Sequence, residues 1–322
     1  MAVIGIDLGG TKIIGAIFNN KGEIINTTSQ LLDKREGLEV GNLVLETIDI
    51  LRKSSAETSK ELQAVGICVP GIADSRTERV WAPNIPGWDN YPLKEEIQLH
   101  LQDNAVRVDV ESDRTCYILG EVWKGAAMGC ENAIYLAVGT GVGAGLFVDG
   151  RIMHGMADIA GCAGWMALGE DEYDNNGATG FMESYASGTG IANYARALMS
   201  KEEFVNESPL YNYDIKMITT HEIFDAYWSG DRLASKVVDK ALNIWGKTAA
   251  NLVSLFNPEK IIWGGGVFGP AVQILDNIYA EALKWGQPIS MKEVKFVGAA
   301  LNGQSALYGA GYLALLSIKD HK

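Results

Sequence analysis

Along the chain, short apolar runs alternate with longer segments in which apolar residues recur every three or four positions. Short apolar runs are typical of buried strands, and apolar residues at the wider spacing form one face of a helix. In residues 38–60, for example, such positions run from Val40 to Leu51. The pattern predicts strands at residues 3–8, 12–18, 23–30, 64–69, 105–110, 132–138, 144–149, 260–263 and 293–297. It predicts helices at residues 38–60, 92–101, 113–127, 181–199, 219–228, 231–256, 269–284 and 303–317.

The two halves of this order repeat one scheme, in which three strands are followed by a helix, a strand and a helix. The repeat predicts a duplicated actin-like (ribonuclease H-like) ATPase fold, an α/β fold of two domains with a cleft. We place the N-terminal domain at residues 1–112 and the larger C-terminal domain at 113–302. The helix at about 303–322 is a candidate to pack back on the N-terminal domain. The Gly-rich segment 154–180 and the turn-rich segment 71–91 are expected to be irregular, the former over a site.

Two glycine turns of the same design occur in corresponding places of the two halves. In both, Gly-Thr opens a stretch that ends in a Phe seven residues after the Thr, at Phe18 and at Phe147. Glycines let the backbone turn tightly and bring N–H groups close to phosphate oxygens. One such turn alone would fit an ordinary β-hairpin equally well, but the second copy favours phosphate binding. The predicted phosphate contacts are Gly9, Gly10, Thr11, Lys12, Gly139, Thr140, Gly141 and Gly143.

Two further features would complete a nucleotide site. Asp7 ends the first strand just before the first turn, where it is placed to hold Mg²⁺ through water, although it would also suit a hairpin cap. Gly264, Gly265 and Gly266 follow a buried strand, and backbone without side chains would let an adenine or ribose lie against it. A tight turn from strand to helix is the simpler interpretation of this triplet when it is taken alone.

Asp113 lies between the two halves, after the strand at 105–110 and at the start of the helix at 113–127. Local sequence alone favours an N-cap role, because Asp is a common cap. The alternative is a general base that accepts a proton from a substrate hydroxyl during phosphoryl transfer.

Composition narrows the classes of partner. The formal net charge is −13, so a nucleic-acid-binding surface is not expected. There is no apolar run of about 18 residues, so no membrane span is expected. The N-terminus leads directly into a strand without the layout of a signal peptide, and the four cysteines lie far apart. A reduced, cytoplasmic protein is the simplest interpretation.

Five segments in order make the chain resemble the ROK family of bacterial sugar kinases, repressors and related proteins. Asp7 to Lys12 resembles its first phosphate motif, and Gly139 to Gly145 the second. The others are the Pro-Asn-x-x-x-Trp loop at Pro83-Asn84 to Trp88, the catalytic Asp at Asp113, and the adenosine segment from Asn257 to Gly266.

The resemblance implies ATP- and Mg²⁺-dependent transfer of a phosphoryl group to a sugar hydroxyl, usually on C6 of a hexose. It assigns Asp113 as the base, Asp7 to the metal and both hairpins to the phosphates. Relatives are often dimers or tetramers, so a homodimer or homotetramer is expected. The repressor branch carries an N-terminal helix-turn-helix, whereas this chain begins at the phosphate strand, which argues against DNA binding.

The resemblance to the family is incomplete at the positions expected to contact the sugar. Ser112 stands where family kinases usually have Asn, and Cys162 and Trp165 stand where they carry Glu and His. Residues 170–180 contain no cysteine, so the family's structural zinc is not expected. Trp165 has two open interpretations, a flat face for the sugar or a filler of core space. Cys162 is favoured as a packing residue over a nucleophile, and His154 as a loop residue at the rim of the site. The resemblance makes the candidate sugar contacts Gly71, Asn84, Ser112, Cys162, Trp165 and Glu183.

These changes predict an acceptor other than free glucose, such as a substituted or N-acylated hexose, a ketose, a polyol or a glycoside. A small-molecule carbohydrate kinase is the favoured function. A catalytically weak sugar- or nucleotide-binding regulator is the alternative, because the sugar pocket has changed. An actin-like ATPase acting on protein partners is a more distant third class.

Overall fold

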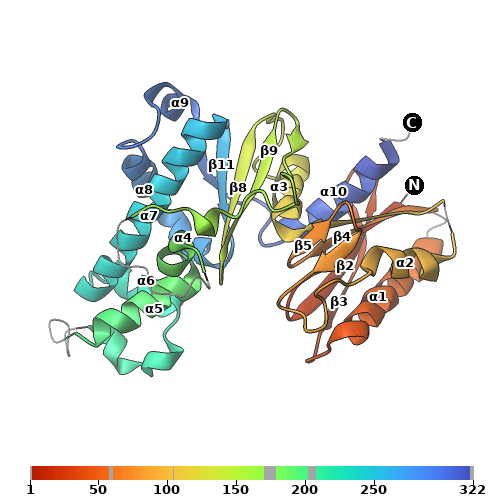
Figure 1. Ribbon diagram of the computed structural model, residues 1–322, viewed down its shortest axis with the longest axis horizontal. Helices are drawn as coiled ribbons and strands as arrows, with labels where there is room; N and C mark the ends of the chain where they lie inside the picture. The colour runs from red at the N-terminus through yellow and green to blue at the C-terminus, as the bar shows by residue number, and fades with distance from the viewer. Residues whose placement is uncertain (1, 58–60, 104, 170–178, 202–207, 320–322) are drawn as a thin grey trace.

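The computed structural model describes residues 2–57, 61–103, 105–169, 179–201 and 208–319. Two five-stranded sheets form the centres of two lobes, which lie side by side along the longest axis (Figure 1). The strands of the first sheet, in spatial order, are β3 (Ile24–Leu31), β2 (Lys12–Asn19), β1 (Ala2–Leu8), β4 (Leu62–Val69) and β7 (Arg107–Ser112). Those of the second are β10 (Arg151–Ile152), β9 (Val142–Val148), β8 (Ala133–Val138), β11 (Lys260–Gly264) and β12 (Lys295–Gly298).

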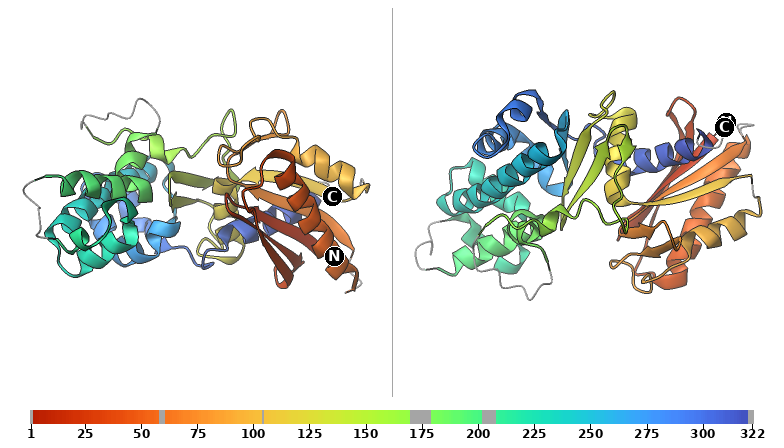
Figure 2. Two further views of the ribbon diagram at one scale, coloured as in Figure 1. Left: turned by 90° about the horizontal axis from the view of Figure 1, so that it is seen from below. Right: turned by 45° about the horizontal axis from the view of Figure 1, so that its top comes forward.

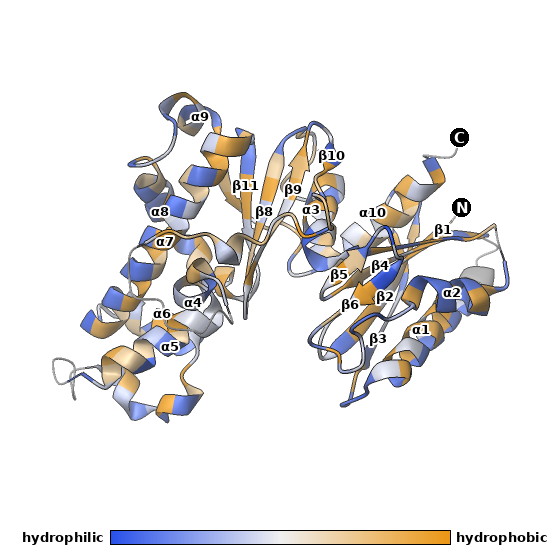
Figure 3. Cartoon of the chain, viewed as in Figure 1, coloured by the Kyte–Doolittle hydropathy of each residue, from blue (hydrophilic) through white to orange (hydrophobic). Residues whose placement is uncertain are grey.

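The two sheets share one topology. β1 pairs with β2 antiparallel and with β4 parallel, as β8 pairs with β9 antiparallel and with β11 parallel. In each sheet one more parallel strand follows, β7 beside β4 and β12 beside β11. The central strands β1 and β8 are predominantly hydrophobic (Figure 3), as expected of strands covered on both faces. The internal repeat predicted from the sequence is therefore present in the structure.

Helices cover both faces of the first sheet. On one face Ile4 and Ile6 of β1 belong to the same buried cluster as Ile48 of α1 (Gly37–Glu57) and Ile97 of α2 (Leu93–Leu101). On the other face Val3 joins a cluster with residues of the C-terminal helix α10 (Ser305–Lys319). The second sheet packs against a helical layer that consists of α4 (Phe181–Ala186), α5 (Gly188–Met199), α6 (Thr220–Trp228), α7 (Arg232–Phe256), α8 (Leu275–Ala282) and α9 (Pro288–Glu293).

Two helices, α3 (Asp113–Lys124) and α10, lie between the sheets (Figure 2). Glycines let them approach closely, because a side chain at Gly309 would collide with the backbone of Cys116, and one at Gly120 with that of Ser305. Glu121 of α3 is fully buried and accepts hydrogen bonds from Ser305 Oγ at 2.7 Å and from the N–H of Ala126 at 2.6 Å. Helix α10 thus joins the first sheet to α3, which itself packs on β8 and β9.

Several predicted elements differ in detail. The segment predicted as the irregular loop 71–91 contains a hairpin of β5 (Ile72–Asp74) and β6 (Arg79–Trp81). The single helix predicted at 181–199 is two, because the Ser187 hydroxyl caps α5 by accepting from the N–H of Gly190. The helix predicted at 269–284 begins as a 3₁₀ segment at Pro270, and α9 was missed. Within the described residues, no helix combines the length and apolarity needed to span a bilayer.

Candidate active site

A cleft of about 1180 Å³ lies between the two lobes. Pockets for one small ligand measure about 300–1,000 Å³, so this cleft has room for two small molecules side by side. Both lobes contribute to it, the first through the ends of β4 and of the β5–β6 hairpin, the second through the β8–β9 turn and α4. The sequence-predicted residues that line it are Gly71, Asn84, Asp113, Gly139, Thr140, Gly141, Gly143, Cys162, Glu183, Gly265 and Gly266.

Asp113 is the first residue of α3 and lines the cleft. The N-cap is Ser112, whose hydroxyl accepts from the N–H of Thr115 at 3.4 Å, so the interpretation of Asp113 as the cap is wrong. Ser112 is only 5% exposed and does not line the cleft, because its hydroxyl is directed into the helix end; this differs from the predicted sugar contact. Burial raises the pKa of Asp113, while the neighbouring charge of Arg114 lowers it in part.

Asp7 lies at the end of β1, paired in register with Cys68 of β4. Burial raises the pKa of Asp7 to about 6; a hydrogen bond with the Cys68 thiol opposes the rise, and the negative charge of Asp113 adds to it. A buried carboxylate near a second one is stabilised in its charged form by a cation. The environment of Asp7 is therefore compatible with a Mg²⁺ ion held through oxygen ligands and water, and the metal role of Asp7 stays a prediction.

The first glycine turn lies beside the cleft rather than in its wall. The Gly9 N–H donates to the carbonyl of Lys12 at 2.9 Å, which closes the turn, and Thr11 and Lys12 are exposed. A Cβ at Gly10 would lie 3.7 Å from Cβ of Asn84, a residue that does line the cleft. The turn is thus next to the cleft on the Asn84 side, but none of the residues from Asp7 to Lys12 lines it.

The second glycine turn faces the cleft directly. Its N–H at Val142 donates to Glu183 Oε2 at 2.8 Å, and its carbonyl at Gly139 accepts from the N–H of Gly188 at 2.7 Å. A Cβ at Gly139 would meet no atom within 4 Å, so this backbone is open to the cleft.

The glycine triplet after β11 has divided roles. Gly264 does not line the cleft, because it packs against the ring and hydroxyl of Tyr135, where a side chain would collide. Gly265 has a φ of 87°, in the left-handed region that favours glycine. Gly266 has open space where a Cβ would stand and lines the cleft.

The residues that replace the family's Glu and His lie apart. Cys162 lines the cleft, and its Sγ accepts a hydrogen bond from Arg114 Nη1 at 3.0 Å. Trp165 is 59% exposed and does not line the cleft, so its interpretation as a core filler is wrong. The short 3₁₀ turn at 163–165 buries Ala163 and Gly164, and the next side chain along it points outward.

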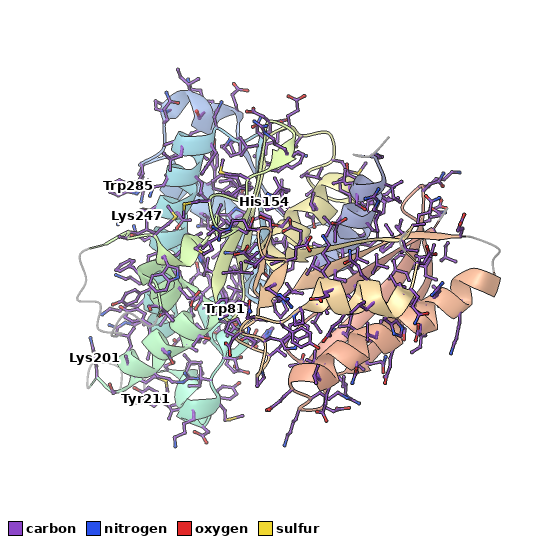
Figure 4. All side chains as sticks on the ribbon, turned by 45° about the vertical axis from the view of Figure 1, so that its right-hand side comes forward. Trp81, His154, Lys201, Tyr211, Lys247 and Trp285 are labelled. Atoms are coloured by element: carbon purple, nitrogen blue, oxygen red, sulfur yellow. The ribbon has the colours of Figure 1, made fainter. Side chains whose placement is uncertain are left out.

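The lining side chains that sequence reasoning missed include Trp81, Arg114 and Tyr117. The position of Arg114 directly after Asp113 in the sequence could have indicated that it lines the cleft. Trp81 ends β6 and is 45% exposed; its place on the hairpin at the junction of the lobes is visible in Figure 4.

His154 was predicted at the rim of the site and lies elsewhere. Its Nε2 is 2.7 Å from Glu111 Oε1, and this hydrogen bond raises the pKa of the imidazole. Both residues line a second hollow of about 690 Å³ between β7, the β9–β10 hairpin and α10. Trp81 and His154 mark the two hollows at separate places along the junction (Figure 4).

Among the residues that the structure describes, no group of three or more His, Cys, Asp or Glu side chains is arranged to hold a metal. The acidic stretch 170–174, interpreted from the sequence as a solvated loop, lies outside the described residues.

Two α/β halves of one topology, each with a glycine turn next to a shared cleft, define the actin-like ATPase fold that the sequence predicted. The family model described as "ROK family" matches residues 3–316, and the chain belongs to that family. The predicted resemblance and fold class are both confirmed.

Three similar proteins place the chain within the family. It is 31% identical to a glucokinase of Halalkalibacterium halodurans over 316 residues, 96% of this chain and 94% of the relative. It is 30% identical to a xylose repressor of Caldicellulosiruptor bescii over 82% of this chain and 65% of that one. A ROK family glucokinase from Streptomyces griseus, solved in complex with glucose and AMPPNP, superimposes with a TM-score of 0.77 at 27% identity over 98% of this chain and 100% of the other.

Proposed function

We propose that the protein is an ATP-dependent carbohydrate kinase that transfers the γ-phosphoryl group of ATP to a hydroxyl of a hexose or hexose derivative. The observation that carries the proposal is the place of Asp113, a half-buried carboxylate in the wall of the cleft that the second glycine turn also lines, close enough to Asp7 for its charge to act on that carboxyl. The family and the glucokinase relatives support the same reaction class.

In the proposed reaction, the acceptor hydroxyl oxygen attacks the γ-phosphorus, and its proton passes to the Asp113 carboxylate. The bond between the γ-phosphorus and the bridging oxygen to the β-phosphate breaks, and ADP leaves with that oxygen. The open backbone at Gly139 and Gly266 supplies room for the nucleotide along the second lobe. Asp7 would hold Mg²⁺, which neutralises phosphate charge when bound.

The acceptor is proposed to lie beside Gly71, between Asn84 of the first lobe and Glu183 and Cys162 of the second. Ser112 is proposed to hold the start of α3, and with it Asp113, in place through its cap. We further propose two domains, residues 1–112 with the C-terminal helix and residues 113–302, which close on the substrates and exclude water. A cytoplasmic location is proposed from the widely spaced cysteines, and a homodimer or homotetramer from the family resemblance; light scattering tests the oligomer.

The deciding experiment measures ADP release from Mg·ATP across a panel of hexoses, N-acyl hexosamines, ketoses, polyols and glycosides. Asp113→Asn is expected to lower kcat about 10²–10⁴-fold, since a general base contributes that much. Asp109→Asn is the matched control, because Asp109 lies on the preceding strand and lines the other hollow. An Asp113→Asn enzyme within about tenfold of wild type would contradict the general-base role.

The second candidate function is a catalytically weak sugar- or nucleotide-binding regulator of the same fold. Two observations favour it, the similarity to a xylose repressor and the changed residues on the sugar side. Calorimetry that detects sugar binding, together with no ADP release for any acceptor in the panel, would favour this function over the kinase.

A further inference from the structure

Arg114 is the single cationic side chain among the described residues that line the cleft. The two other charged side chains in that lining are acidic, Asp113 and Glu183. Arg114 is the second residue of α3, so its backbone is fixed next to Asp113. Its Cγ and Cδ pass over Gly143, where a Cβ would come within 2.9 Å of both atoms. Strand β9 therefore leaves room for this arginine.

The partners of the guanidinium hold it without neutralising it. Nη1 donates to Cys162 Sγ at 3.0 Å, and Nη2 donates to the backbone carbonyl of Asp158 at 3.4 Å. Both acceptors are uncharged. The Asp158 carboxylate is directed elsewhere, accepting from the N–H and the hydroxyl of Ser75 at 2.9 Å each. Within the described part of the chain, Arg114 forms no ion pair at 4.0 Å or less.

A guanidinium has five N–H donors in a planar fork that matches a carboxylate or phosphate, and Arg114 uses two of its nitrogens on neutral acceptors. A charge removed from water is stabilised most by an opposite charge with hydrogen bonds. A carboxylate at position 162 would satisfy Arg114 within the protein, whereas the Cys162 sulfur leaves the positive charge available to a ligand.

We propose that the acceptor of this kinase carries an anionic group, a carboxylate or a phosphate, and that Arg114 recognises it. The inference rests on the proposed kinase function and narrows its substrate class to acidic or phosphorylated sugars. Arg114 is assigned to the acceptor rather than to ATP because its guanidinium bonds Cys162, a predicted sugar contact, while only Cγ and Cδ of its side chain pass over Gly143 of the second glycine turn.

The test compares two pairs of acceptors in which each member keeps a free C6 hydroxyl. One pair is N-acetylglucosamine and its 3-O-lactyl ether, which adds a carboxylate. The other is glucose and glucose 1-phosphate, which adds a phosphate. Wild type is expected to favour the anionic member of at least one pair by about 10-fold or more in kcat/KM, as charge-assisted hydrogen bonds allow. The pair that shows the preference identifies which anion is recognised.

Variants then assign the preference to the arginine. Arg114→Gln is expected to abolish it, Arg114→Lys to retain part of it, and Arg114→Glu to reverse it, each with KM for ATP within about threefold of wild type. Arg107→Gln is the matched control, because Arg107 is an exposed arginine of β7 that lines the other hollow. This control is expected to keep the wild-type preference.

The outcomes separate this inference from the kinase proposal. Turnover of neutral sugars with no anionic preference overturns the inference and leaves the kinase standing. If the Arg114 variants raise KM for ATP instead of KM for the acceptor, Arg114 binds the nucleotide, and the inference is also overturned. If no acceptor is turned over, the kinase proposal fails, and calorimetry with the same four sugars decides the inference. Tighter binding of the anionic sugars that depends on Arg114 supports the inference. Equal binding of the neutral and anionic sugars overturns the inference.

Discussion

Glu183 Oε2 accepts a hydrogen bond of 2.8 Å from the backbone N–H of Val142, so the carboxylate expected to bind the sugar also fixes the second glycine turn. The contact is close, since a Cβ at Gly141 would lie 2.7 Å from the same oxygen. Glu183 belongs to α4 and Val142 begins β9, so the bond ties the helical layer to the edge of the cleft. One side chain thus influences both proposed subsites.

We therefore predict that Glu183→Gln changes the kinetics of both substrates. The amide keeps an oxygen for the Val142 N–H but loses the charge, and a hydrogen bond to a charged group is worth about 1.5–3 kcal/mol against about 1 for a neutral one. KM for the acceptor and KM for ATP are both expected to rise severalfold in steady-state assays. A rise confined to the acceptor would show that the bond to the turn has no functional weight.

The raised pKa of Asp7 predicts a pH dependence of stability with a definite sign. The carboxyl has a pKa of about 6 in the folded protein, above the ordinary value of 3.8, so the folded state favours the protonated form. Its contribution to stability is fully present below the unfolded pKa of about 4 and is lost as pH rises through the folded pKa of about 6. Between pH 5 and pH 8, wild type is expected to lose about 1–2 kcal/mol of unfolding free energy through this group.

Asp7→Asn is expected to remove this loss, as measured by urea unfolding at the two pH values. The same variant is expected to lose most of the rise in Tm that Mg²⁺ with ADP gives to wild type, because the proposed metal ligand is gone. In wild type, kcat/KM is expected to fall below about pH 6 as Asp7 takes up its proton. An unchanged Mg²⁺ effect in Asp7→Asn would place the metal elsewhere.

The buried carboxyl of Glu121 predicts how firmly α10 is attached. It accepts from the Ala126 N–H and the Ser305 hydroxyl, and the N–H of Ala300 lies 3.2 Å from both its oxygens. Glu121→Ala leaves the buried Ser305 hydroxyl without this partner, at about 1–3 kcal/mol, and the less buried N–H groups of Ala126 and Ala300 add smaller losses. We expect a loss of about 2–5 kcal/mol in urea unfolding. Ser305→Ala removes one bond and serves as the comparison, with a smaller loss expected.

Much of the cleft was predictable because its parts are local in sequence. Glycine turns between apolar runs specify strand, turn and strand, and both turns occur where β1–β2 and β8–β9 were expected. Asp113 follows a strand in which Val108 and Val110 alternate with charged residues, so its position at the end of a strand was also predictable. The internal repeat then predicted that the two glycine turns lie at equivalent edges of the two sheets.

Other features depend on contacts that no local pattern encodes. Whether Ser112 or Asp113 caps α3 is a one-residue shift in the helix start, below the resolution of sequence patterns. The Arg114–Cys162 bond joins residues 48 positions apart, so neither residue signals it alone. Trp165 looked like a pocket or core residue by its chemistry, but the 3₁₀ turn that carries it leaves it exposed.

The divided roles of the glycine triplet give a matched pair of variants. Gly266→Ala adds a methyl group in open space that borders the cleft, so the free energy of unfolding is expected to stay within about 0.5 kcal/mol of wild type. Gly264→Ala forces a methyl group against the Tyr135 ring and hydroxyl, and overpacking of this kind destabilises by about 1–3 kcal/mol.

Kinetics distinguish the same pair. If the nucleotide lies against Gly266, the new methyl group takes part of its space, and KM for ATP is expected to rise about tenfold at unchanged acceptor KM. Gly264→Ala is expected to lose stability, measured by urea unfolding, with KM for ATP close to wild type in the protein that remains folded. If Gly266→Ala leaves KM for ATP unaltered, the nucleotide lies elsewhere in the cleft, and the open backbone at Gly139 is the next position to substitute.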